Sequence, residues 1–431
     1  MSQGVSRKAF DFRLAAWMLY DFAATAFVVV VVTLIGGLYF KRIVAPGPTG
    51  DLLWGAAGAA STVLVAAAAP LLGAAADEGG CKARYLTIFS LAAIVASACI
   101  GATHPGMAAV GFILFVAANS AFQVASVFYH AYLPELASEA NLSRLSGYGW
   151  AMGYAGAIFA VLAVSPLISG GISLASFERV RLAFPLQAAI FLLLSLPAFW
   201  LLRERQTCPV SPGRGVFRRG GARLLETWRG VRGLSQLTRF LIAYVLYNDG
   251  LNTVLYFSII YAADTLGLSM RQLVPLYLLV QTSGIVGAVG FGRLGDRIGI
   301  KPTLAATLAL WLFVLLGAWA ARTAGVFFVV AAAAGLLIGS TQALSRAMMA
   351  LLTPPGRAAE FFSFYGVSGR VSAAAGPLTF GLVSYLTGSQ RPAILSIAAF
   401  FLIGLALLLR VEVGRGVAEK MAASRGRYVL T

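Results

Sequence analysis

Residues 17–40 read WMLYDFAATAFVVVVVTLIGGLYF, an apolar run that holds a single carboxylate, Asp21. About 20 mainly apolar residues are enough for a helix to cross the hydrocarbon core of a bilayer. A carboxylate at the bilayer centre costs about 3 kcal/mol even on mild insertion scales, and such groups usually face the interior of a helix bundle. The stretch therefore predicts a transmembrane helix whose Asp21 faces other helices or a water-filled cavity.

Similar apolar runs recur along the whole chain of 431 residues, of which 59% are hydrophobic and only 11% charged, with a mean hydropathy of +0.83. An average soluble domain carries about 25% charged residues. We predict an all-α integral membrane protein with twelve transmembrane helices, near residues 14–40, 51–76, 85–103, 107–133, 146–168, 182–202, 239–263, 270–294, 302–321, 324–351, 360–387 and 390–410.

The formal net charge is +17, and most of the 33 lysines and arginines fall in alternate loops and in the two ends of the chain. Because cytoplasmic loops carry an excess of Lys and Arg, this pattern predicts that both termini are cytoplasmic. The charge is thus a sign of membrane orientation, and we expect no nucleic-acid partner.

The longest polar stretch, 203–238, divides the spans six and six. We predict an N-terminal six-helix bundle at 1–202, a basic cytoplasmic linker at 203–238, a C-terminal bundle at 239–411 and a cytoplasmic tail at 412–431. The linker is either a simple tether or contains an interfacial helix, which would lie on anionic lipid.

The two halves of the chain share landmarks in the same order. LYDFAAT at 19–25 matches LYNDGLNT at 246–253, and FQVASVFYHAYLP at 122–134 matches TQALSRAMMALLTP at 341–354. An internal match at a fixed period is the sequence sign of a structural repeat. We therefore expect two pseudo-symmetric bundles of six helices each.

The turn after the second span reads GAAADEGGCKAR at 73–84, and the turn after the eighth reads GRLGDRIGIK at 292–301. The second copy resembles the signature of the major facilitator superfamily, while the first has Glu78 where a basic residue is usual. An Asp at a helix end can accept hydrogen bonds from a neighbouring helix N-terminus and pair with Arg. We predict Asp77, Asp296 and Arg297 as gating residues; the alternative is a tight turn with ordinary flanking charges.

Three longer stretches carry a more specific resemblance: the opening run, FYHAYLPELASEANLSRLSGYGWAMGYAGA at 128–157 and TQALSRAMMALLTPPGRAAEFFSFYGVSGRVSAAAGP at 341–377. Together they resemble the bacterial branch of the autophagy-related vacuolar effluxer family within the major facilitator superfamily. The resemblance implies the major facilitator fold, in which spans 1, 4, 7 and 10 line a central cavity. It also implies small amino acids as the first expectation for the substrate.

Polar residues inside the spans are candidates for function by default. The predicted substrate- or proton-binding residues are Asp21, Thr25, Asn119, Gln123, His130, Asn248, Asp249, Asn252, Gln281, Gln342, Arg346 and Arg370.

Arg370 is expected to bind a substrate carboxylate, and Asp21 and Asp249 an amine or a proton. Alternatively, Asp21 only neutralises Arg346 or Arg370. Arg346 is expected to act as a gate or as a snorkelling residue that faces lipid. His130 is expected to be a proton relay, because its reference pKa is about 6.5, or simply a hydrogen-bonded residue of its helix.

Small residues share the expected helix face of Arg370 and would leave room around its guanidinium: Ser363, Gly366, Ala373 and Pro377.

The sequence holds no Walker-type phosphate loop, and its two histidines and three cysteines suggest neither a metal cluster nor a nucleophile–base pair. We expect no enzyme activity, no metal and no cofactor.

We predict a monomeric secondary-active or facilitative transporter of a small polar or zwitterionic solute in the bacterial inner membrane. It would work by alternating access, surrounded by membrane lipids, with a proton as coupling ion or with no coupling. The alternatives are an exporter of amphipathic drugs or lipids, and a non-transporting membrane sensor or assembly partner.

Overall fold

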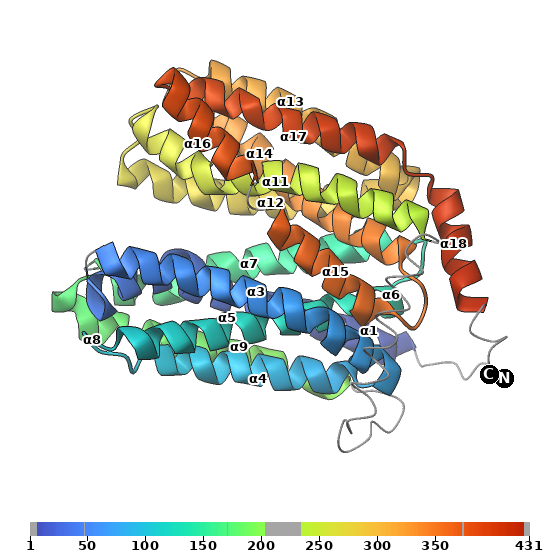
Figure 1. The fold of residues 1–431 in the computed structure, drawn as a ribbon, viewed down its shortest axis with the longest axis horizontal. Helices are drawn as coiled ribbons and strands as arrows, with labels where there is room; N and C mark the ends of the chain where they lie inside the picture. The colour runs from blue at the N-terminus through green and yellow to red at the C-terminus, as the bar shows by residue number, and fades with distance from the viewer. Residues whose placement is uncertain (1–6, 47, 170, 203–233, 373–374, 426–431) are drawn as a thin grey trace. The chain divides into compact units, whose positions relative to one another are not determined.

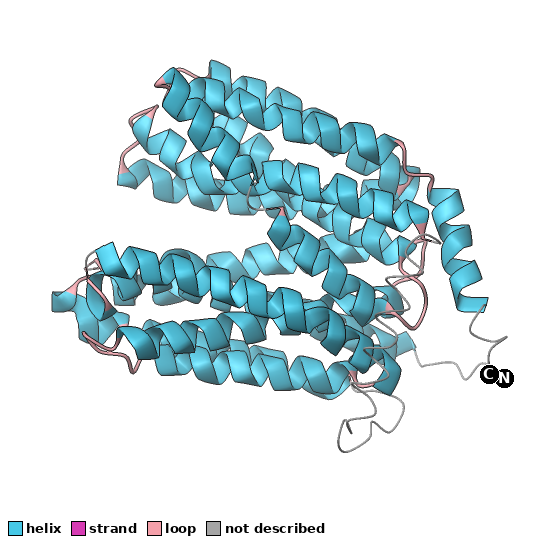
Figure 2. Cartoon of the chain, in the orientation of Figure 1, coloured by secondary structure: helices cyan, strands magenta, loops and turns pink. Residues whose placement is uncertain are grey.

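A computed structural model describes residues 7–46, 48–169, 171–202, 234–372 and 375–425. This described part consists of helices and the loops that join them, without a strand (Figure 2). The expected linker tether or interfacial helix falls largely at 203–233, outside the described residues, so the predicted domain boundaries stay a prediction.

Each of the twelve predicted spans coincides with helix. The first half contains α1 (Arg7–Phe27) with the π-helical turns η1 (Val28–Leu34) and η2 (Phe40–Val44) around α2 (Gly36–Tyr39), then α3 (Pro48–Gly79), α4 (Lys82–Ile100), α5 (Ala108–Ala131), α7 (Leu142–Ile168) and α9 (Ala183–Leu201). Short elements join these helices: α6 (Leu133–Leu136), η3 (Leu174–Ser176) and α8 (Phe177–Val180).

The second half contains α11 (Ser235–Asp264), α12 (Met270–Ile298), α13 (Ile300–Ala320), α14 (Ala324–Leu352), α15 (Ala358–Val371), α16 (Ala375–Thr387), α17 (Gln390–Leu409) and α18 (Val413–Arg425). The predicted eleventh span is therefore two helices, α15 and α16. The tail begins with a helix of its own, α18.

Ten helices of the described part are long and apolar enough to cross a membrane. The helix α11 falls below this threshold because Asn248, Asp249 and Asn252 lower its hydropathy. The helices α15 and α16 are each too short to count alone. The protein is an integral membrane protein of the all-α class, as the sequence predicted.

The chain forms two compact units. The first contains the described residues up to Tyr132 and those from Met152 to Leu202; the second contains Leu133–Ala151 and the described residues from Leu234 onward. The helix α7 thus contributes to both units: Leu142–Ala151 packs with the second and Met152–Ile168 with the first.

The same four neighbour relations occur in each unit. In the first unit α1 packs on α9, α3 on α5, and α4 on both α5 and α9; in the second α11 packs on α17, α12 on α14, and α13 on both α14 and α17 (Figure 1). In span numbers these pairs are 1–6, 2–4, 3–4 and 3–6, and then 7–12, 8–10, 9–10 and 9–12. The pseudo-symmetric repeat predicted from the sequence is confirmed.

The two signature turns contain a glycine that the backbone requires. Gly80 has a φ of 61° and Gly299 a φ of 101°, each three residues after the signature Asp. A side chain with a β-carbon is disfavoured in this region of φ. Each turn between a unit's second and third spans therefore needs glycine at this position.

Candidate solute site and gate

The eleventh span is broken where proline forbids a continuous helix. The helix α15 ends at Val371, and α16 begins at Ala375 with Pro377 in its first turn. Proline has no N–H to bond the carbonyl four residues earlier, and its ring clashes with that carbonyl, so it is tolerated in the first turn of a helix but not in the interior. The break exposes the carbonyl end of α15 and the N–H end of α16, and both need partners inside the bundle.

Two neighbouring residues of α11 supply these partners. The Asn248 amide donates to the Gly369 carbonyl at 3.2 Å and to the Ser372 hydroxyl at 2.6 Å, at the end of α15. The Asp249 Oδ1 accepts from the Gly376 N–H at 2.9 Å, and its carboxylate also accepts from the N–H of Ala375. Asp249 therefore caps α16 from another helix, where a negative charge also favours the positive end of the helix dipole.

The fit around Asp249 is close. A β-carbon on Gly376 would lie 2.8 Å from Asp249 Oδ1 and nearer still to the Thr253 hydroxyl. The Thr253 hydroxyl itself donates to the Asp249 carbonyl at 2.7 Å. Only glycine at this position lets the first turn of α16 approach the carboxylate.

Arg370 lies in the last turn of α15, next to this break. Its Nη1 atom is buried and has no hydrogen-bond partner among the described residues. The Tyr244 hydroxyl lies beside it, against Gly369, and the Tyr244 ring stacks on Tyr365 with centroids 4.4 Å apart. A half-buried guanidinium whose Nη1 donor is buried and unfilled can bind an anionic group from outside the protein.

The expected small-residue face around Arg370 is corrected by the break. Because the helix ends at Val371, Pro377 is on α16 and does not continue the face of α15; Ala373 lies outside the described residues. Ser363 and Gly366 remain on α15, earlier in the same helix.

In the first unit, Asp21 and Thr25 lie on α1 opposite Gly153 of α7. A β-carbon on Gly153 would be 3.3 Å from Thr25 Oγ1 and 3.6 Å from Asp21 Oδ2. The Thr25 hydroxyl donates to the Asp21 carbonyl at 2.8 Å. Asp21 is half-buried, so it keeps some access to solvent.

The predicted polar stripe of the fourth span lies on α5. Asn119 is buried, and Gln123 and His130 are half-buried. The Gln123 Oε1 is buried without a partner in the described part of the chain. The His130 ring lies 5.1 Å from that of Tyr129.

In the second unit, Gln281 and Gln342 are half-buried on α12 and α14. The Asn252 amide lies 3.5 Å from the Ser372 hydroxyl, one turn beyond Asn248. The structure thus brings Asn248, Asp249 and Asn252 together at the break in the eleventh span.

Arg346 does not face lipid, so the snorkelling alternative is wrong: its side chain is 1% exposed. Its Nε donates to the Ser146 hydroxyl at 3.0 Å and its Nη2 to the Ser146 carbonyl at 2.6 Å, and the guanidinium lies over the Trp150 ring. Ser146 in turn donates to the Ala343 carbonyl. Arg346 therefore fastens the beginning of α7 to α14.

The signature Asp296 holds the same segment from α12. Its Oδ1 accepts from the N–H groups of Ser143 at 3.0 Å and Arg144 at 3.2 Å, and its Oδ2 lies 3.7 Å from Arg144 Nε. These N–H groups belong to the first turn of α7, which lacks partners within the helix. Asp296 thus caps α7 and also approaches the Arg144 side chain.

The other predicted gating residues differ from Asp296. Arg297 is exposed and lines a cavity of about 230 Å³ together with Arg144 and Arg293. In the first unit, the side chain of Asp77 is fully buried, 3.9 Å from Lys82 Nζ.

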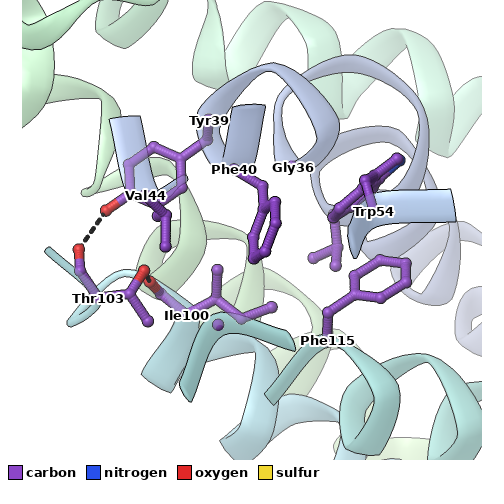
Figure 3. A pocket seen from close by; sticks show the side chains of 10 residues that line it. Gly36, Tyr39, Phe40, Val44, Trp54, Ile100, Thr103 and Phe115 are labelled. Atoms are coloured by element: carbon purple, nitrogen blue, oxygen red, sulfur yellow. Dashed lines mark hydrogen bonds between the residues drawn. The ribbon is translucent and has the colours of Figure 1, made fainter. Parts of the chain in front are cut away.

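A small cavity beside the π-helical turns carries no solute site. It is lined mainly by apolar side chains, among them Phe40, Trp54 and Phe115, and has a volume of about 10 Å³ (Figure 3). This is about the least space that a single water needs. The Tyr39 hydroxyl near it is already bonded to the Thr103 carbonyl.

Sequence reasoning missed several residues that complete these sites: Tyr244, Ser372, Gly376, Ser143 and Ser146. Pro377 was the available signal for the break, because a proline inside an apolar span marks a helix interruption. Nothing in the sequence distinguishes Ser143 and Ser146 from other serines at helix starts.

Comparisons with known proteins place the chain. A family model described as "Vacuole effluxer Atg22 like" matches residues 56–421. The uncharacterised MFS-type transporter YxiO of Bacillus subtilis is 29% identical over 93% of this chain and 95% of its own length.

Autophagy-related protein 22 of Cryptococcus neoformans is 28% identical over 66% of this chain; the match spans only 56% of that fungal protein. Among solved structures, the human organic anion transporter MFSD10 superposes with a TM-score of 0.72 at 18% identity, over 94% of this chain and all of that one.

The Escherichia coli fucose:proton symporter FucP superposes with a TM-score of 0.71 at 13% identity, over 94% of this chain and 99% of its own. At such identities the likeness shows the fold, which is that of major facilitator transporters. The chain is a membrane transporter of the major facilitator type and belongs to the vacuole effluxer Atg22-like family.

Proposed function

We propose that this transporter moves a small solute that carries a carboxylate, with zwitterionic amino acids as the first candidates, and that it does so by alternating access. The family description names an effluxer, which supports export as the direction. The relative in Bacillus supports a bacterial cytoplasmic membrane as its location. The distribution of Lys and Arg supports cytoplasmic termini.

The observation that carries this proposal is the unfilled donor of Arg370. A buried neutral donor without a partner costs about 1–3 kcal/mol, and a buried charged donor costs more. Broken helices at membrane depth are also where transporters of this general kind hold their solutes. A substrate carboxylate would take up the Nη1 donor beside the break between α15 and α16.

The two intramembrane aspartates receive different roles. The Asp249 carboxylate is engaged by the N–H groups at the start of α16, so we assign it to holding the break in shape. Asp21 is half-buried and faces a continuous helix, so we assign it to the substrate ammonium or to a coupling proton. The amide side chains Gln123 and Gln342 would add neutral hydrogen bonds.

The gate we propose is the segment Leu142–Ala151. Asp296 from α12 and Arg346 from α14 both hold it by its backbone, and Gly147 and Gly295 let the helices pack closely. Release of these bonds in one step would free the beginning of α7, as alternating access requires of one bundle against the other.

A thermal-shift screen of the purified protein tests the proposal, with amino acids, small organic anions, lipids and cationic drugs at two pH values. A ligand at 100 times its Kd stabilises by about 2.7 kcal/mol, which a melting curve detects. We expect a shift with amino acids that Arg370→Gln abolishes and Arg322→Gln, at an exposed loop arginine, preserves.

A shift with amphipathic compounds alone would replace this proposal by an exporter of drugs or lipids. No shift with any compound would favour a sensor or assembly partner. An amino-acid shift that survives Arg370→Gln would remove Arg370 from the site.

A further inference from the structure

A third cavity, away from the break, lies between the beginning of α11 and the end of α17. It has a volume of about 440 Å³ and is lined by Arg239, Ile242, Leu407, Arg410 and Glu412. No hydrogen bond or ion pair within the described part of the chain engages the side chains of Arg239, Arg410 or Glu412. Three charged groups around one cavity are thus available to a ligand.

The cavity lies where the apolar surface of the protein ends. The apolar span of α17 finishes at Leu409, directly before Arg410. Ile242 is 52% exposed and Leu409 57% exposed, so apolar side chains border the charged ones. Phospholipid headgroups occupy this level of a bilayer, with their acyl chains against the neighbouring apolar surface.

The backbone around the cavity is held by side chains. Lys301 Nζ donates to the Leu409 carbonyl at 2.9 Å, which fixes the end of α17. The Gln236 Oε1 accepts from the Glu412 N–H at 2.9 Å, and Gln236 is fully buried one turn before Arg239. The relative positions of the two arginines and the carboxylate are therefore set by the fold of the second unit.

We propose that this cavity binds a phospholipid headgroup that carries both a phosphate and a primary ammonium, which is the chemistry of phosphatidylethanolamine. Arg239 and Arg410 would hold the phosphate, because guanidinium groups pair well with phosphate oxygens. Glu412 would accept from the ammonium. Phosphatidylglycerol carries the same single phosphate charge but no ammonium to pair with the Glu412 carboxylate, and the quaternary ammonium of phosphatidylcholine has no N–H to donate to it.

The test is a titration of detergent-purified full-length protein with phosphatidylethanolamine, phosphatidylglycerol and phosphatidylcholine of equal chain length, followed by native mass spectrometry. An arginine near the membrane surface contributes about 1 kcal/mol to lipid binding. Removing two arginines should therefore lower the affinity for the lipid by roughly tenfold or more. We expect phosphatidylethanolamine to bind best, and Arg239→Gln with Arg410→Gln to weaken it by that factor. Arg322→Gln, in the loop between α13 and α14, is the matched control and should bind as the wild type does.

A second variant keeps the proposal testable if the double variant folds poorly. Glu412→Gln retains both arginines, so it should bind phosphatidylethanolamine no better than phosphatidylglycerol. Equal binding of all three lipids by the wild type would overturn the proposal, as would unchanged preference in Glu412→Gln. Glycerophosphoethanolamine, the headgroup without acyl chains, should bind far more weakly; equal binding would point to a soluble phosphate compound and would also overturn it.

Discussion

The two units contain the same constellation in two settings. Asp21 and Thr25 on α1 face Gly153 of α7, and Asp249 and Thr253 on α11 face Gly376 of α16. In each case the threonine hydroxyl donates to the carbonyl of the aspartate four residues earlier. These are spans 1 and 5 in the first unit and spans 7 and 11 in the second.

The difference lies in the facing helix. The helix α7 is continuous through Gly153, so its N–H groups there are engaged within the helix. The helix α16 begins at Ala375, so its first N–H groups are free to bond the Asp249 carboxylate. The comparison teaches that the two aspartates meet different surroundings: a helix end meets the Asp249 carboxylate, whereas a continuous helix faces Asp21. This difference is why we assign Asp249 to structure and propose Asp21 for transport.

The largest expected effect is a difference in stability between alanine variants of the two glycines. Gly376→Ala would force a β-carbon onto the Asp249 carboxylate and the Thr253 hydroxyl, and overpacking of this kind costs about 1–3 kcal/mol. Gly153→Ala needs only a small shift of the Thr25 hydroxyl and gains helix propensity, so its stability should stay close to that of the wild type.

Melting temperatures of the two variants in the same detergent measure this difference. We expect a fall of several degrees for Gly376→Ala and almost none for Gly153→Ala. Equal falls would mean that the two sites are packed alike.

The next largest effect is a difference between variants of the two aspartates in stability and in transport. Asp249→Ala leaves two N–H groups at the start of α16 without an acceptor, which costs about 1–3 kcal/mol, while Asp249→Asn keeps an acceptor oxygen and should cost less. Asp21→Asn should leave stability near normal and abolish transport. Thermal denaturation and transport assays on all three variants test this. Loss of stability in Asp21→Asn, with Asp249→Ala unaffected, would reverse the assignment.

Much of the fold, and several residues of the candidate site, could be predicted from the sequence. The spans, the repeat and the polar residues follow from hydropathy and matching motifs, because lipid forces every backbone group into helix and every polar group inward. Asp21, Asp249 and Arg370 stood out for that reason. Pro377 was a signal for the break inside the eleventh span, but the apolar run continues through it, so 360–387 was predicted as one span.

The hydrogen-bond partners of these residues could not be predicted from the sequence. That Asp249 caps α16, or that Ser146 receives Arg346, depends on which helices meet at which height, and many serines and glycines are equally eligible. The sequence left Arg346 as a gate or a lipid-facing residue, and its burial rules out the second alternative. A position near a span end does not distinguish lipid from a neighbouring helix.

The smallest expected effect is shared by both units. Thr25→Val and Thr253→Val each remove one hydroxyl that bonds a carbonyl within its own helix, and valine fills nearly the same space. The loss of one such hydrogen bond costs about 0.5–1.5 kcal/mol. Parallel melting curves should show similar small decreases. A much larger decrease for Thr25→Val would indicate that its hydroxyl also supports Asp21 directly.

The central claim is that Arg370 binds the carboxylate of a transported solute. Its most direct test is counterflow of a radiolabelled mixture of the common amino acids into proteoliposomes that contain the wild type, Arg370→Gln, Arg370→Lys or the control Arg322→Gln.

We predict exchange by the wild type and the control, partial exchange by Arg370→Lys, and a loss of at least about tenfold in Arg370→Gln, as expected when a hydrogen bond to a charged group is removed. Exchange by Arg370→Gln at the wild-type rate would contradict the claim.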